Sequence, residues 1–107
     1  MYADYLLEHH GDHLYKIDQG FAIYRFLNEK QVYIVDIYVK PEFRKTGIAS
    51  TIADDIGAIS KLRGCSEMLG TVVPSAKNST ASLKVLLGYG MKLQSSSNDL
   101  IVFIKEL

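Results

Sequence analysis

Hydrophobic side chains form short runs along the chain, and these runs predict β-strands. Residues 13–17 alternate weakly between apolar and polar positions, and residues 21–27 (FAIYRFL) are rich in the aromatic and branched side chains that favour strands. Residues 31–39 (QVYIVDIYV) are almost continuously apolar, which predicts a strand buried on both faces. The polar segment 28–30 between the last two runs is short, so we expect them to pair as a hairpin.

Two longer stretches carry the three- and four-residue spacing of amphipathic helices. The first is expected to begin at Thr46 or Gly47 and to end near Arg63. Its apolar stripe consists of Ile48, Ile52, Ile56, Ile59 and Leu62. The second is expected over residues 79–87. Its inward-facing residues are Leu83, Leu86 and Leu87. A shorter helix is also predicted over residues 2–10.

A strand predicted over residues 67–73 follows the first long helix. Strand, helix and strand form a βαβ unit, so the strands at 31–39 and 67–73 are expected to lie parallel. Residues 91–94 and 100–104 predict a final hairpin across the polar turn 95–99. The pattern therefore predicts an α/β fold whose sheet mixes one parallel pair with antiparallel hairpins.

Composition narrows the class of protein. With 107 residues, 48% of them hydrophobic and 22% charged, the chain is expected to form a single globular domain, residues 1–107. Twelve basic and twelve acidic side chains balance, which argues against nucleic-acid binding. A single cysteine, Cys65, excludes an internal disulfide and fits a reducing compartment. The sequence shows neither a secretory signal nor an apolar run long enough for a membrane span, so a cytoplasmic location is expected.

Residues 44–49 (RKTGIA) join the long strand to the first long helix and carry the clearest candidate chemistry. The first turn of a helix presents free N–H groups and the positive end of the helix dipole, so it suits an anion. Gly47 lets a ligand approach the backbone, and Arg44 and Lys45 add positive charge. An ordinary strand-to-helix turn with solvated basic residues explains the same pattern. The segment is neither a P-loop nor a three-glycine dinucleotide motif.

The segment VYIVDIYVKPEFRKTGIA, residues 32–49, closely resembles the signature of the GNAT superfamily of acetyl-CoA-dependent N-acetyltransferases. That signature is a strand ending in an apolar-x-Val-x-Pro run, followed by Arg/Gln-x-x-Gly-x-Gly/Ala. The matching residues are Ile37, Val39, Pro41, Arg44, Gly47 and Ala49. A second block, residues 79–91, resembles the family's Asn-, Ser- and Leu-rich helix, with Gly90-Met91 in place of its final Gly-Phe. The resemblance covers roughly residues 21–104.

The resemblance implies a fold and a co-substrate. The fold is a mixed, mostly antiparallel sheet with a splayed parallel strand pair and helices on both faces, and the co-substrate is acetyl-CoA. Pantetheine would enter between the splayed strands, and the pyrophosphate would sit on the amides of residues 45–49. The implied cofactor-binding residues are Ile37, Tyr38, Val39, Arg44, Lys45, Thr46, Gly47, Ile48, Ala49, Ser50, Asn78 and Ser82. Helix capping and packing explain Asn78 and Ser82 as well.

The chain also departs from the family pattern. The family begins with a strand and two helices that help to form the acceptor site, whereas only about 20 residues precede Phe21. We therefore expect a partner subunit, as in a homodimer, or a large acceptor to complete that wall. Some members carry a tyrosine in the second helix as general acid, and Leu86 holds that position here. Others carry a glutamate base before the aspartate of the first block, and Val35 holds that position.

Two residues are candidates for proton transfer. Asp36 lies inside the apolar strand and would act as a base in a desolvated site, although a structural or solvent-facing carboxylate is the simpler explanation. By alternation it shares a face with Ile34 and Tyr38. Tyr89 would protonate the departing thiolate if the helix end directs it at the cleft, although a packed ring is the simpler explanation.

Two other groups of residues are assigned no chemistry. His9, His10 and His13 lack the spacing and partner ligands of a metal site, so no metal is expected. Cys65 has no neighbouring histidine in the sequence and is interpreted as a packing residue rather than a nucleophile.

The sequence therefore predicts a small acetyl-CoA-dependent N-acetyltransferase. A primary amine, on a small molecule or a protein, would attack the thioester directly in a ternary complex. The alternative is a catalytically weak or inactive CoA-binding or protein-interaction module with the same fold. The shortened N-terminal region, Val35 and Leu86 favour that alternative.

Overall fold

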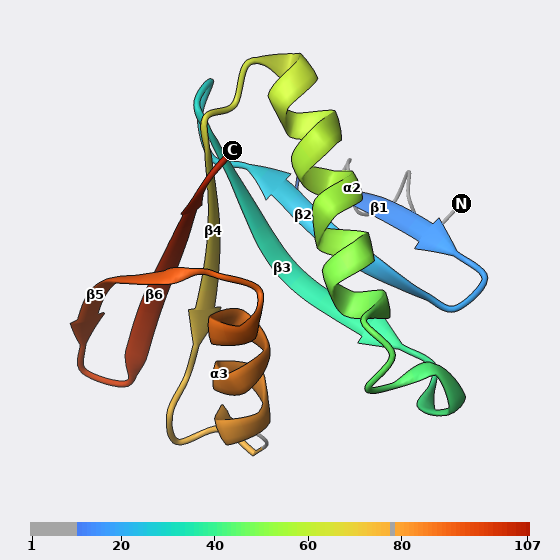
Figure 1. Ribbon diagram of the computed structural model, residues 1–107. Helices are drawn as coiled ribbons and strands as arrows, with labels where there is room; N and C mark the ends of the chain where they lie inside the picture. Colours follow the sequence, from blue (N-terminus) through green and yellow to red (C-terminus); the bar gives the residue numbers. More distant parts are fainter. Residues whose placement is uncertain (1–10, 78) are drawn as a thin grey trace.

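The computed structural model describes residues 11–77 and 79–107 and contains a six-stranded sheet with helices packed against it (Figure 1). The strands are β1 (Asp12–Ile17), β2 (Gly20–Phe26), β3 (Gln31–Val39), β4 (Glu67–Val72), β5 (Lys92–Ser97) and β6 (Leu100–Glu106). The helices are the 3₁₀ turn η1 (Pro41–Phe43), α2 (Ile48–Arg63) and α3 (Ser79–Gly88). The helix predicted over residues 2–10 lies outside the described residues.

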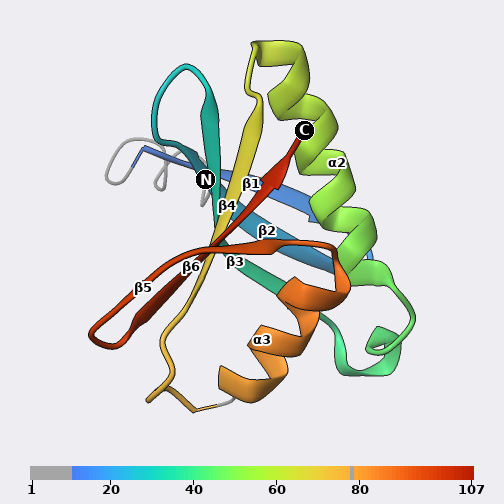
Figure 2. The same cartoon turned by 60° about the vertical axis from the view of Figure 1, so that its left-hand side comes forward.

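The sheet has the strand order β1-β2-β3-β4-β6-β5 and contains a single parallel pair, β3 with β4. These two strands pair over residues 31–33 and 67–69 and then diverge, so the sheet splays toward their carboxyl ends (Figure 1). The prediction of a mixed, mostly antiparallel sheet with a splayed parallel pair is confirmed. Helices α2 and α3 lie on the same face of this sheet and face each other across the splay, whereas helices on both faces were predicted (Figure 2).

Strand β3 contains a β-bulge at Val35. Ile23 of β2 pairs with Asp36, whereas the next residue, Tyr24, pairs with Ile34. Val35 is therefore the extra residue on β3. An extra residue in one strand bends that strand and shifts its alternation by one position. The side chains that follow the bulge consequently point to the opposite faces from those that strict alternation predicts.

The bulge changes which β3 side chains face the helices. Ile34 and Ile37 both face α2 and α3, and Asp36 and Tyr38 face the other side. The prediction that Ile34 shares a face with Asp36 and Tyr38 is therefore wrong. The predicted burial of both faces is also wrong, because Val35 is 37% exposed and Tyr38 is 40% exposed.

Helix α2 begins and ends close to the predicted positions, but its buried stripe differs from the prediction. Ile52 and Ile56 are fully buried as expected, and the row continues at four-residue spacing to Ser60. Ile59 is 39% exposed and Leu62 is 92% exposed, so their predicted burial is wrong. The sheet therefore packs along an i, i+4 row of the helix rather than along the three-residue steps that lead to Leu62.

The C-terminal elements also differ in detail from the prediction. Leu83 and Leu86 are partly buried, but Leu87 is 53% exposed, so its predicted inward orientation is wrong. The predicted turn 95–99 is shorter than expected, because β5 extends to Ser97. Asn98 adopts a left-handed conformation with φ of 50° at the tight turn into β6.

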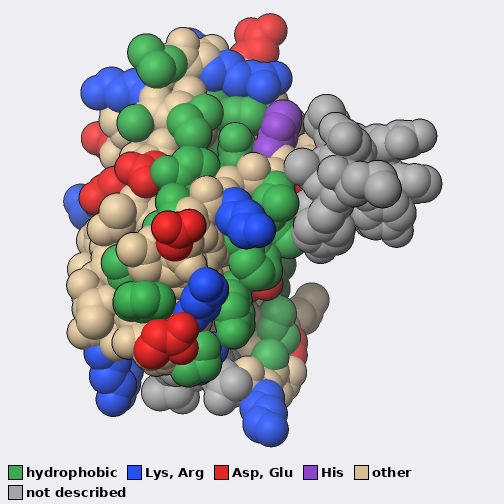
Figure 3. Space-filling view, turned by 90° about the vertical axis from the view of Figure 1, so that its right-hand side faces the viewer, with side chains coloured by type: hydrophobic (Ala, Val, Ile, Leu, Met, Phe, Trp, Pro, Cys, Tyr) green, Lys and Arg blue, Asp and Glu red, His purple; other side chains and the backbone are tan. Residues whose placement is uncertain are grey.

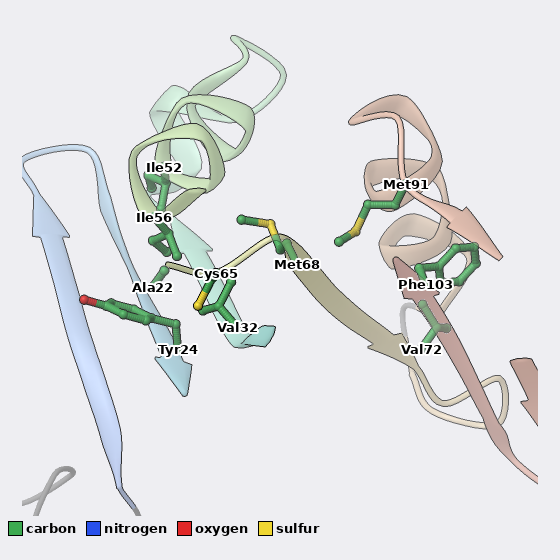
Figure 4. Close-up of a cluster of buried hydrophobic side chains, with 10 residues drawn as sticks. All are labelled: Ala22, Tyr24, Val32, Ile52, Ile56, Cys65, Met68, Val72, Met91 and Phe103. Atoms are coloured by element: carbon green, nitrogen blue, oxygen red, sulfur yellow. The ribbon is translucent and has the colours of Figure 1, made fainter. Parts of the chain in front are cut away.

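Buried apolar side chains form one continuous core that spans the splay (Figure 4). On one side lie Ala22, Tyr24, Val32, Ile52, Ile56 and Cys65. On the other side lie Val72, Met91 and Phe103. Met68 of β4, which is fully buried, lies between the two groups. Among the described residues, neither helix has the length and apolar character needed to cross a bilayer.

Candidate functional site

The amino terminus of α2 leaves backbone N–H groups free to bind an anion. Gly47 is the N-cap residue, and no side chain caps the helix. The amide of Thr51 donates to the carbonyl oxygen of Gly47 at 3.1 Å, which is the first bond of the helix. The amides of residues 48–50 precede that bond and have no acceptor within the helix. Together with the helix dipole, they form a surface of the kind that suits an anion, and it is called the anion-binding surface.

The loop before α2 exposes this surface to solvent. Lys45 and Gly47 both adopt left-handed backbone conformations, with φ of 64° and 85°. Such a conformation strains a non-glycine residue, so the strain at Lys45 is a local feature of this loop. A Cβ atom placed on Gly47 would have no neighbour within 4 Å, so the backbone here is open to a ligand. The hydroxyl of Thr46 donates to the carbonyl oxygen of Phe43, which fixes the loop.

Arg44 is directed away from the free amides. Its Nε donates to the carbonyl oxygen of Val39 at 3.0 Å, and its guanidinium lies 5.7 Å from the centre of the Tyr38 ring. Tyr38 in turn stacks on Phe21, with ring centres 5.4 Å apart. Arg44 therefore packs against the end of β3, on the face of the sheet that carries Tyr38. Lys45 is the loop cation without such a contact among the described residues.

An apolar cavity lies next to the anion-binding surface, where β3 and β4 diverge. Its volume is about 30 Å³, and its walls come from β3, β4 and both helices. The lining residues are Ile34, Ile37, Ala49, Ser50, Ala53, Met68, Val85, Leu86, Tyr89 and Met91. The bulge at Val35 is what brings two β3 side chains to this cavity. The residues that α2 contributes to its wall, Ala49, Ser50 and Ala53, have small side chains.

Tyr89 closes one wall of the cavity at the end of α3. Its hydroxyl donates to Oδ1 of Asp54 on α2 at 2.6 Å. Nζ of Lys105 donates to the Tyr89 carbonyl oxygen at 2.9 Å and lies 3.8 Å from the ring centre. Partial burial, followed by the hydrogen bond to Asp54, raises the pKa of Tyr89 above its usual range. The phenol therefore keeps its proton at neutral pH.

The structure brings together part of the predicted set of site residues. Ile37, Ala49 and Ser50 line the cavity, and the loop 45–47 leads directly into the free amides of residues 48–50 at the start of α2. Val39 packs against the core, and its carbonyl oxygen accepts the bond from Arg44. The exposed side chains of Asp36 and Tyr38 lie on the other face of the sheet. Asn78 and the side chain of Ser82 lie outside the described part of the chain.

Sequence reasoning missed several contributors to the site. Met68 and Met91 close the cavity from β4 and from the segment before β5, and no local pattern indicates that they meet. The position of Asp54 near the site could have been predicted from the sequence. Asp54 lies four residues after Ser50, so the two side chains share one face of the helix. Within residues 11–77 and 79–107, no group of three His, Cys, Asp or Glu side chains is arranged to hold a metal ion. Cys65 is a buried free thiol in the core.

The chain was then compared with known proteins. The family model described as "Acetyltransferase (GNAT) family" matches residues 3–89. The chain belongs to the GNAT acetyltransferase family. Two curated relatives, the thialysine N-epsilon-acetyltransferases of Sus scrofa and Bos taurus, are each 32% identical to it over 71 residues. The match covers 63% of this chain and 42% of each relative, so the chain spans less than half the length of those relatives.

Solved structures of the GNAT family share this fold. A GNAT family acetyltransferase from Elizabethkingia anophelis, with acetyl-CoA bound, superposes with a TM-score of 0.75 at 18% identity, covering 97% of this chain and 80% of that chain. A Bacillus subtilis acetyltransferase in complex with CoA superposes with a TM-score of 0.72 at 17% identity, covering 99% and 82%. At these identities the likeness concerns the fold. The resemblance found in the sequence is thereby confirmed for the family and the architecture.

Proposed function

We propose that this protein is an acetyl-CoA-dependent N-acetyltransferase. The observation that carries the proposal is the uncapped start of α2, with free amides at residues 48–50, opening directly onto an apolar cavity between splayed strands. An anion site beside an apolar cavity at a splay in the sheet suits a diphosphate joined to a flexible thioester arm. Family membership and the CoA complexes of proteins with this fold support acetyl-CoA as the co-substrate.

The loop and the cavity bind different parts of acetyl-CoA. The pyrophosphate accepts hydrogen bonds from the α2 amides, and Lys45 adds a cation beside it. The pantetheine arm lies along β3, where Ile37 forms the wall and the strand edge beyond the last β3–β4 pair offers backbone groups. Holding the thioester in this way supplies the rate enhancement chiefly by positioning.

The chemical step is a direct acyl transfer. The neutral amine nitrogen attacks the thioester carbonyl carbon, a C–N bond forms, the C–S bond breaks, and CoA leaves as a thiolate. The proton lost by the nitrogen passes through water to Asp36 or to solvent, and Tyr89 or solvent protonates the thiolate. Asp36 is exposed and Tyr89 is bonded to Asp54, so in this proposal neither group is required to dominate the rate.

The acceptor is proposed to be a primary amine at the end of a flexible side chain. The activity for which the Sus scrofa and Bos taurus relatives are named, acetylation of the ε-nitrogen of thialysine, supports this class. Basic and acidic side chains are interspersed on the face shown in Figure 3, in keeping with a formal net charge of zero. A homodimer and a cytoplasmic location stay predictions.

Calorimetry with acetyl-CoA, followed by a turnover assay, tests the proposal. Binding is expected at micromolar to millimolar ligand, and release of the CoA thiol is expected with thialysine, lysine or short diamines. Absence of binding at millimolar acetyl-CoA would refute the proposal. Binding without turnover across amine, peptide and protein acceptors would instead support the inactive CoA-binding module, which the exposure of Asp36 and the presence of Leu86 at the tyrosine position favour.

A further inference from the structure

The splay divides the molecule into two halves. The first half is β1–β3 with α2, which packs on β2 and β3, and the second half is β4–β6 with α3, which packs on β4. Among the described residues, backbone bonds join the halves at one end of the splay: the strands pair at residues 31–33 and 67–69, and the amides of Ser66 and Glu67 donate to the carbonyl oxygen of Lys30. Toward the carboxyl ends of β3 and β4, where the cavity opens, the separation of the halves depends on side chains.

The bond between Asp54 and Tyr89 crosses this opening on the helix side. Asp54 belongs to the first half, and Tyr89 belongs to the second, where Lys105 of β6 holds its carbonyl oxygen and its ring. Tyr89 also lines the cavity, whereas Asp54 does not. Among the described side chains, this is the hydrogen bond that joins α2 to the end of α3.

A second tyrosine–aspartate bond on the same helix, partly buried where the bond from Tyr89 to Asp54 is exposed, provides a comparison. The hydroxyl of Tyr15 donates to Oδ2 of Asp55 at 2.6 Å, the same length as the bond from Tyr89 to Asp54. Tyr15 lies on β1, so both partners belong to the first half. This bond fixes α2 to its own sheet and does not cross the cavity.

We propose that Asp54 is a positioning residue that acts through Tyr89 to fix the separation of α2 and α3, and thereby the width of the acetyl-CoA cleft. This inference rests on the proposed function. The hydrogen bond tethers the end of α3 to α2, so its loss would free the apolar cavity walls to shift relative to each other. The bond between Asp54 and Tyr89, whose ring contacts Lys105, sets the distance between α2 and the end of α3 before the ligand binds.

Three variants test the inference by calorimetry with acetyl-CoA. Asp54→Ala removes the acceptor and is expected to weaken binding about five-fold, the equivalent of the net contribution of one hydrogen bond. Asp54→Asn keeps an acceptor oxygen and is expected to restore most of the affinity. Asp55→Ala removes the matching bond to Tyr15 and is expected to leave the affinity within about two-fold, although both alanine variants lose one hydrogen bond and melt at similarly lowered temperatures.

Equal affinities of Asp54→Ala and Asp55→Ala for acetyl-CoA would overturn the inference, as would tighter binding by Asp54→Ala. Failure of the unmodified protein to bind acetyl-CoA would refute the proposed function instead, so the two failures are distinguishable. Should Asp54→Ala not fold, Tyr89→Phe and Tyr15→Phe repeat the comparison by removing only the donor hydroxyls. The same five-fold difference between them is expected, and its absence overturns the inference.

Discussion

The hydroxyl of Ser60 is fully buried on α2 and has no hydrogen-bond partner among the described residues. A buried polar group without a partner costs free energy, and alanine has the higher helix propensity. We therefore expect Ser60→Ala to raise the free energy of unfolding by about 1 kcal/mol, measured by denaturant titration. Ser66→Ala, at an exposed position, serves as the control and should change it little. A destabilised Ser60→Ala variant would contradict the prediction.

His13 makes stability depend on pH. It stacks on Tyr24 with ring centres 5.2 Å apart, and burial, followed by the charge of Arg63, lowers the pKa of His13 below 6.5, although Asp12 opposes the shift. A lowered folded-state pKa means that the unfolded chain binds the proton more readily, so this group destabilises the fold as pH falls below about 6.5.

The variant His13→Phe tests this linkage because it keeps an aromatic ring on Tyr24 and cannot titrate. Unfolding free energies measured at pH 5 and pH 7.5 should differ less in His13→Phe than in the unmodified protein. Subtracting the pH-dependent change in unfolding free energy of the variant from that of the unmodified protein removes the contributions of His9 and His10, which both proteins contain. An identical pH dependence in the two proteins would show that His13 does not contribute.

At the scale of an element, the loop that leads into α2 holds a lysine next to the free amides of the helix. Lys45 lies in the exposed loop beside the free amides, whereas Lys40 precedes the 3₁₀ turn η1. We expect Lys45→Glu to weaken acetyl-CoA binding by about three- to ten-fold, since reversal of an exposed charge acts over a short screened distance. Lys40→Glu makes the same change in net charge and should have a smaller effect.

The salt dependence of binding separates these two variants further. Loss of the Lys45 contact should flatten the decline of acetyl-CoA affinity with added salt, because fewer charged contacts then remain to be screened. Equal affinities and equal salt dependences of Lys45→Glu and Lys40→Glu would show that the loop cation does not face the diphosphate.

At the scale of the whole molecule, Met68 connects the two halves of the core. It is fully buried, lies between the two groups of core side chains and lines the cavity (Figure 4). Met68→Ala is expected to lower the free energy of unfolding by about 2–5 kcal/mol, because it removes buried contacts and leaves a cavity. Leu62→Ala, at a residue that is 92% exposed, should cost less than about 0.5 kcal/mol. Comparable losses in the two variants would contradict this account of the core.

Local patterns determined the elements of this protein and their order. Strand-forming runs, turn residues and the start and end of α2 are properties of neighbouring residues, so the hairpin β2–β3, the parallel pair β3–β4 and the loop 44–47 followed from the sequence. The free amides at the start of α2 followed for the same reason, because they exist wherever a helix begins without a cap, and the binding of an anion there stays a prediction.

Only the tertiary structure decided which faces of those elements meet. The bulge at Val35 reversed the side chains beyond it, and the sheet selected the row that ends at Ser60 rather than the one that ends at Leu62. The contact between Asp54 and Tyr89, 35 residues apart, depends on the splay of the sheet. Strand register and helix rotation are fixed by packing between distant residues, and packing energies of that kind leave no periodic signal in the chain.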